Sequence, residues 1–220
     1  MLLFAVMMLL AACAPGKDFK YGIEQLNIIN SKYGTTMSTY PDTTGKMDLM
    51  IGELSNLKNL NLNSGQQPLN YIVDYRILDL EAEKLYSESQ KFGNAGTTKS
   101  GFSCKPRPLV LESASLRNQA ALKAFEAVDV LRKLIREYPE DASSINLSEK
   151  NALFLNATFY QIEKDAKNDI SVINRFCPEN ATLGFYMQEF KSKKLMSDEE
   201  ISRLTYKDAV VIWKEERGFE

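Results

Sequence analysis

The sequence SEKNALFLNATFYQIEKDAKNDISVINRFC, residues 148–177, contains neither glycine nor proline. Its apolar side chains recur at steps of three and four residues, namely Ala152, Leu155, Phe159, Ile162, Ala166, Ile170, Ile173 and Phe176. An α-helix has about 3.6 residues per turn, so this spacing places the apolar side chains on one face. Ser148 suits the position just before a helix, where its hydroxyl can accept from a free backbone N–H. The pattern predicts one unbroken helix over 148–177.

Two other long segments have the same periodicity. Pro68–Phe92 begins with a proline, which suits the first turn of a helix, and is followed by Gly93, a typical helix end. Pro108–Tyr138 stops at Pro139 and carries a stripe of small and apolar residues. Helices of similar length joined by short connections pack as antiparallel neighbours. We therefore predict an all-α fold, an antiparallel helical bundle with three long helices (about 68–92, 108–138 and 148–177) plus shorter N- and C-terminal helices.

Shorter helical segments flank these three. Apolar spacing and turn residues predict helices over residues 21–33, 47–60 and 183–190. Near the C-terminus, Ser197 with Glu200, and Thr205 with Asp208, have the spacing of capping boxes, which mark helix starts. The β-branched run Val210–Ile212 could also form a strand. A helix is expected there because the chain offers no other convincing strand to pair with it.

A weak internal repeat points to a different helical fold. Residues 134–142, LIREYPEDA, are similar to residues 173–181, INRFCPENA. Helices that end in a proline at such a spacing, together with the stretch LNATFY at 155–160, resemble tetratricopeptide repeats. This alternative, a tetratricopeptide-like helical repeat, requires a turn near residues 163–168 that divides the segment 148–177 into two helices.

The N-terminus, MLLFAVMMLLAAC, is apolar and uncharged up to Cys13. It is far shorter than the roughly 20 apolar residues of a membrane-spanning helix, so it is interpreted as the apolar part of a signal peptide. The small residues Ala11 and Ala12 directly before Cys13 resemble the lipobox of prokaryotic lipoproteins. The resemblance implies that residues 1–12 are a signal peptide that is removed and that Cys13 carries lipid. Residues 13–20 would then tether a single helical domain, 21–220, to the outer face of a prokaryotic membrane.

The signal segment departs from that family in one respect. No Lys or Arg precedes the apolar run, where signal peptides carry a positive charge. Either the true start lies upstream of Met1 or the export signal is weak. The other interpretation of this segment is a buried N-terminal helix with an incidental cysteine.

Composition restricts the chemistry. The chain is 44% hydrophobic and 25% charged with a net charge of -2, as in ordinary globular proteins, and it has no basic stripe for nucleic acid. It contains no histidine, which excludes Ser–His and Cys–His catalysis and histidine-containing zinc sites. The stretch GNAGTTKS at 93–100 fails as a phosphate-binding loop because Thr98 replaces the second glycine and no strand precedes it. We expect no nucleotide, no nucleic acid, no cofactor and no metal site.

With Cys13 assigned to lipid, Cys104 and Cys177 remain. An even pair of cysteines in an exported protein indicates a disulfide, and the other possibility is two free buried thiols. In an antiparallel bundle the start of the helix 108–138 and the end of the helix 148–177 lie at the same end. The helix order therefore favours a Cys104–Cys177 disulfide.

Two function classes remain open. Carboxylates are frequent on the predicted helices, at Asp79, Glu81, Glu83, Glu126, Asp129, Glu163 and Asp165. Such groups usually face solvent or pair with nearby Lys and Arg, whereas catalysis needs two of them to converge in a pocket. We predict no catalytic residue and a non-catalytic cell-envelope lipoprotein, a binding or scaffold module for another envelope component. The expected partner is a protein of the envelope. The alternative is a lipid-anchored hydrolase that uses paired carboxylates.

Overall fold

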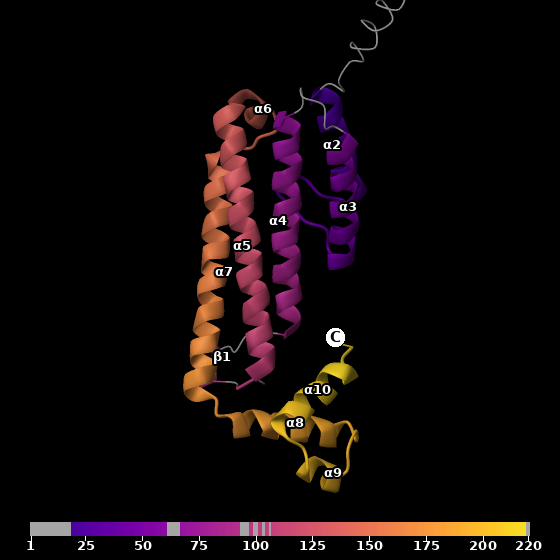
Figure 1. Ribbon diagram of the computed structural model, residues 1–220, viewed down its shortest axis with the longest axis vertical. Coiled ribbons are helices and arrows are strands. Elements are labelled where there is room, and N and C mark those ends of the chain that lie inside the picture. Colours follow the sequence, from indigo (N-terminus) through magenta and orange to yellow (C-terminus); the bar gives the residue numbers. More distant parts are fainter. Residues whose placement is uncertain are drawn as a thin grey trace, which may run out of the picture. The chain divides into compact units, whose positions relative to one another are not determined.

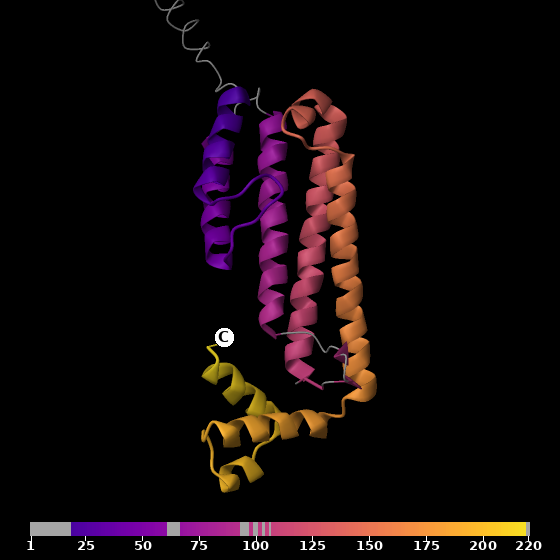
Figure 2. The same ribbon diagram turned by 180° about the vertical axis from the view of Figure 1, so that it is seen from behind.

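The computed structural model describes residues 19–60, 67–92, 97–98, 101–102, 104–105 and 107–218. Its three long helices are α4 (Gln67–Phe92), α5 (Arg107–Glu137) and α7 (Glu149–Phe176), and they lie side by side as an antiparallel bundle (Figures 1 and 2). Each begins and ends within one residue of its predicted bounds, so the predicted all-α bundle is confirmed. The predicted signal segment, the predicted lipidation site at Cys13 and most of 93–100 lie outside the described residues.

Six shorter helices accompany the bundle in the described ranges: α2 (Phe19–Lys32), α3 (Thr44–Leu60), α6 (Pro139–Ser144), α8 (Glu179–Ser192), α9 (Asp198–Ser202) and α10 (Tyr206–Glu216). The two strands β1 (Thr97–Thr98) and β2 (Gly101–Phe102) form a short antiparallel hairpin. Neither α6 nor the hairpin was predicted. None of the helices in the described ranges is long and apolar enough to cross a membrane.

Helix α7 decides between the two predicted folds. It is continuous through residues 163–168, so the tetratricopeptide-like alternative is wrong. The reason lies in its buried face, where Ala152, Phe159, Ala166 and Ile173 recur every seventh residue and are each at most 2% exposed. A turn in the middle of the helix would rotate half of this face out of the core.

The chain forms two compact units. The first comprises Met1–Lys84 with Lys123–Ala157, and the second comprises Leu85–Leu122 with Thr158–Glu220. The long helices contribute residues to both, so this division does not test the prediction of a single helical domain over 21–220. Each unit has its own buried residues.

In the first unit, α2 and α3 lie beside α4 (Figure 1). Helix α2 approaches α4 closely at Gly22, where an added Cβ would lie 2.1 Å from a methyl carbon of Leu69. Helix α3 begins three residues earlier than the predicted Met47. The core of this unit includes large side chains that are at most 1% exposed: Leu26, Met50, Leu54, Leu69, Ile72, Leu80, Leu131 and Leu134.

In the second unit, α8, α9 and α10 enclose a small aromatic core. Both predicted capping boxes are present, at Ser197 with Glu200 before α9 and at Thr205 with Asp208 before α10. The β-branched run in α10 is helical, as expected. The core residues of this group are Leu109, Tyr186, Phe190, Ile201, Ala209 and Trp213.

The predicted disulfide joins Cys104, just before α5, to Cys177, the residue after α7. The Cα atoms of Cys104 and Cys177 are 5.5 Å apart, within the range of a disulfide. Val110 and Ile173 pack with the bridge and are fully buried. The prediction from helix order is therefore confirmed.

Candidate binding site

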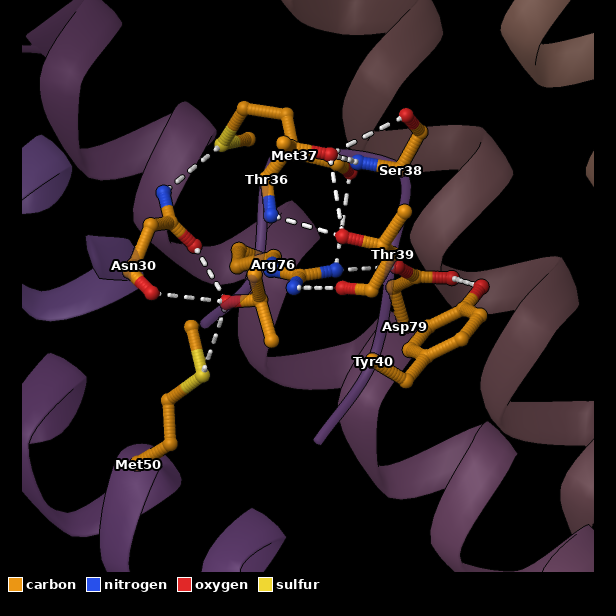
Figure 3. A network of polar contacts seen from close by, with 10 residues as sticks. Asn30, Thr36, Met37, Ser38, Thr39, Tyr40, Met50, Arg76 and Asp79 are labelled. Atoms are coloured by element: carbon orange, nitrogen blue, oxygen red, sulfur yellow. Dashed lines mark hydrogen bonds and ion pairs between the residues drawn. The ribbon is translucent and has the colours of Figure 1, made fainter. Parts of the chain in front are cut away.

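The candidate site lies in the first unit and is built around the loop 35–40, which follows α2. Helix α4 holds this loop through the guanidinium of Arg76 (Figure 3). Arg76 Nη2 donates to the carbonyl oxygen of Thr39 at 2.5 Å, and Nη1 lies 3.5 Å from that of Met37. Because Arg76 is fully buried, these bonds fix the path of the loop from inside the unit.

Asp79 completes the anchor one helical turn further along α4. Arg76 Nη1 donates to Asp79 Oδ2 at 3.0 Å, and the Tyr40 hydroxyl donates to Asp79 Oδ1 at 2.8 Å (Figure 3). The guanidinium carbon of Arg76 also lies 5.5 Å from the centre of the Tyr40 ring. Asp79 is 1% exposed and does not face solvent; of the two roles expected for such carboxylates, it has the second, pairing with a nearby arginine at helical spacing.

Burial controls the protonation of this anchor. It raises the pKa of the Asp79 carboxyl above its usual range, and the opposing effects of Arg76 and the Tyr40 hydroxyl offset this only in part. Burial also raises the pKa of the Tyr40 hydroxyl, and the charge of Asp79 adds to the rise. The Tyr40 hydroxyl therefore stays protonated and remains a donor to Asp79.

One side of the loop borders a hollow of about 410 Å³, here called the amide hollow. Its lining residues carry four amides and four hydroxyls and no ionisable side chain: Asn27, Asn30, Ser31, Thr35, Thr36, Met37, Ser38, Ile145, Asn146, Leu147 and Asn151. The hollow forms where α2 and the loop meet the connection between α6 and α7. It is a concave, uncharged surface with many hydrogen-bonding groups.

A second hollow of about 380 Å³, here called the aromatic hollow, adjoins the first. Ser38, Asn146 and Asn151 line both hollows. The other lining residues of the aromatic hollow are Tyr40, Tyr75, Asp79, Ser148, Lys150, Phe154 and Leu155. The two hollows together form a surface that is amide-rich at one end and aromatic at the other.

The connection between α6 and α7 has a defined geometry. Asn146 adopts a left-handed conformation, with φ of 60°, which asparagine tolerates better than most residues. Its backbone N–H donates to Ser143, and the N–H of Leu147 donates to Ala142. Asn151 Oδ1 accepts from both the backbone N–H and the hydroxyl of Ser148, each at 3.0 Å. This places the side chain of Asn151 in the wall between the hollows.

Most of the other carboxylates of the hydrolase alternative pair with a lysine or an amide, or are exposed. Glu81 and Glu126 come together only around the ammonium of Lys123, at 2.9 and 3.7 Å. Glu163 pairs with Lys167 at 2.6 Å, and Asp129 is exposed. Asp165 accepts from Gln161 at 2.8 Å, and Glu83 is half-buried.

Sequence reasoning missed the two hollows. The residues of 27–38 and 143–151 are rich in Asn, Ser and Thr, a composition that is typical of turns and helix ends. Nothing in the local pattern indicates that the two segments meet in space. The helical spacing of Arg76 and Asp79 can be read from the sequence. Their burial beneath the loop 35–40, which is far from them in sequence, cannot.

Comparison of the chain with protein-family models, with curated proteins and with solved structures gave no match. Among the described residues, no cluster of three or more acidic, cysteine or histidine side chains is arranged to hold a metal ion. Taken together, the two hollows of the first unit combine amide, hydroxyl and aromatic groups in their lining.

Proposed function

We propose that the protein is a non-catalytic, lipid-anchored binding module of the cell envelope. The observation that carries the proposal is the pair of adjoining hollows, since concave surfaces with a few placed polar groups are typical of ligand sites. The loop 35–40, which contributes residues to both hollows, is held by the buried Arg76–Asp79 ion pair. A site that is ordered before binding loses less conformational entropy when its ligand arrives.

The location rests on two further observations. The lipobox-like sequence ending at Cys13 implies a lipid anchor. The Cys104–Cys177 disulfide supports export, because disulfides persist mainly in oxidising compartments.

Binding is favoured over hydrolysis by the environment of Asp79. Asp79 is the one carboxylate among the residues that line the two hollows. Its Oδ1 accepts from the Tyr40 hydroxyl and its Oδ2 accepts from Arg76. A carboxylate-dependent hydrolase needs a second acid that faces the first across the substrate.

The anchor is tested by Cys13→Ser in the native host. The variant is expected to leave the membrane fraction or to accumulate with residues 1–12 attached, because the lipid acceptor is missing. The double variant Cys104→Ser/Cys177→Ser is the matched control and should stay in the membrane fraction. Wild-type protein that fractionates as soluble and unmodified, with residues 1–12 still present, would contradict the anchor.

The binding surface is tested by a photo-crosslinking amino acid at Ser38, which is exposed and lines both hollows. The matched control places it at Ser202 in α9, which is equally exposed and belongs to the second unit. An adduct in living cells is expected from Ser38 and not from Ser202. Equal yields at both positions, or none at Ser38, would overturn the proposed binding site.

A further inference from the structure

The absence of ionisable groups from the lining of the amide hollow restricts what can bind there. A charged ligand group placed among amides and hydroxyls would lose its hydration without gaining an opposite charge. Amides and hydroxyls each donate and accept hydrogen bonds. Their natural counterpart is a neutral ligand whose own groups both donate and accept, as sugar hydroxyls do.

Several of these lining groups have hydrogen-bonding capacity to spare. Asn30 is 4% exposed, and its amide nitrogen donates to Met37 Sδ at 3.7 Å (Figure 3). A thioether sulfur is a weak acceptor, so an incoming hydroxyl oxygen would be a better partner. The side chains of Asn27, Ser31 and Asn146 make no hydrogen bond to any other described residue.

The aromatic hollow supplies the complementary surface. Tyr40, Tyr75 and Phe154 are among its lining residues, and Phe154 is the most accessible of the three, with 74% of its surface exposed. The C–H face of a pyranose ring is apolar and packs on aromatic rings, which present large rigid surfaces.

We propose that the two hollows bind a neutral oligosaccharide, an inference that rests on the proposed binding function. One sugar unit lies in the amide hollow and a neighbouring unit stacks in the aromatic hollow, with Ser38, Asn146 and Asn151 between them. A peptide is the less suitable occupant. Strand addition needs a free sheet edge and helix docking needs a continuous apolar groove, and the lining of the amide hollow offers neither.

The test is calorimetric titration of the full-length protein in a detergent without a sugar head group, since a glycosidic detergent would compete. The probes are cellohexaose, maltohexaose and fully N-acetylated chitohexaose, with a pool of neutral capped octapeptides as the comparison. At least one hexasaccharide is expected to bind. Phe154→Ala and Asn146→Asp should each weaken that binding about tenfold, the first by removing the stacking surface and the second by replacing an amide donor with a charge.

Matched controls separate a site effect from a change in fold. Phe185→Ala removes a half-exposed ring from α8, and Asn168→Asp adds the same charge to an exposed position of α7; both should bind as the wild type does. Binding of the octapeptides alone, no binding of any hexasaccharide at millimolar concentration, or equal weakening by the controls would overturn the proposal. If the Ser38 adduct forms while no hexasaccharide binds, the ligand class is wrong and the binding module stands.

Discussion

At the scale of single residues, Arg76 explains why a polar loop has a fixed position. A buried guanidinium must find acceptors, and Arg76 finds two backbone carbonyls and the carboxylate of Asp79. The spacing of the ion pair could be predicted from the sequence. Its burial could not, because burial depends on a loop that precedes α4 and whose composition resembles an ordinary turn.

Replacing Arg76 should destabilise the first unit strongly. Arg76→Met leaves Asp79 buried without its cation and two carbonyls without a donor, and losses of this kind amount to about 3–5 kcal/mol. The free energy of unfolding, measured by urea titration with circular dichroism, should fall by that amount. The control Lys46→Gln breaks the exposed pair with Asp42 and should change stability by less than about 1 kcal/mol. Equal effects of the two variants would show that the buried pair does not anchor the loop.

At the scale of elements, the sequence predicts helices well because their signals are local. Apolar periodicity located α4, α5 and α7, and the two capping boxes located α9 and α10. Helix α6 was missed because Pro139 was interpreted only as the end of the preceding helix. A proline in the first turn also suits the start of a new helix, and α6 begins at this residue.

The contact between α8 and α10 depends on the charge of Glu189. Its carboxylate accepts from the indole N–H of Trp213 at 2.5 Å, from Lys193 at 3.2 Å and from Arg217, whose guanidinium lies 4.1 Å from the Trp213 ring centre. Burial alone would raise the pKa of Glu189, but the hydrogen bonds from Arg217, Trp213 and Lys193 together lower it below its ordinary value of 4.5.

This lowered pKa makes the contact sensitive to acid. A carboxylate whose pKa is lower in the folded state contributes stability above its unfolded value, and that stability is lost as the pH falls through the folded value. Trp213 is the single tryptophan of the chain, so its fluorescence reports on this contact. We expect its emission to shift to the red as the pH falls below 4.5, and Glu189→Gln to show the shifted emission already at pH 7. Glu199→Gln, at an exposed pair with Arg203, should behave like the wild type.

At the scale of the whole molecule, the order of the helices could be predicted, and with it the disulfide. Antiparallel packing requires only three helices of similar length, and the apolar periodicity of the sequence predicts three such helices. The two compact units and the hollows could not be predicted, because they depend on which of many polar segments meet across the chain. The side chains of Asn30 and Asn146, for example, carry no local signal that they line the same hollow.

The Cys104–Cys177 disulfide should contribute strongly to the stability of the chain. The two cysteines are 73 residues apart, and closing a loop of this length in the unfolded chain corresponds to about 4 kcal/mol in the chain-entropy model. The double variant Cys104→Ser/Cys177→Ser should lose about this much free energy of unfolding in a urea titration. Reduction of the wild type with dithiothreitol should produce the same loss, and the double variant should not respond to it. If reduction does not change the urea midpoint of the wild-type protein, the disulfide does not constrain the unfolded chain as predicted.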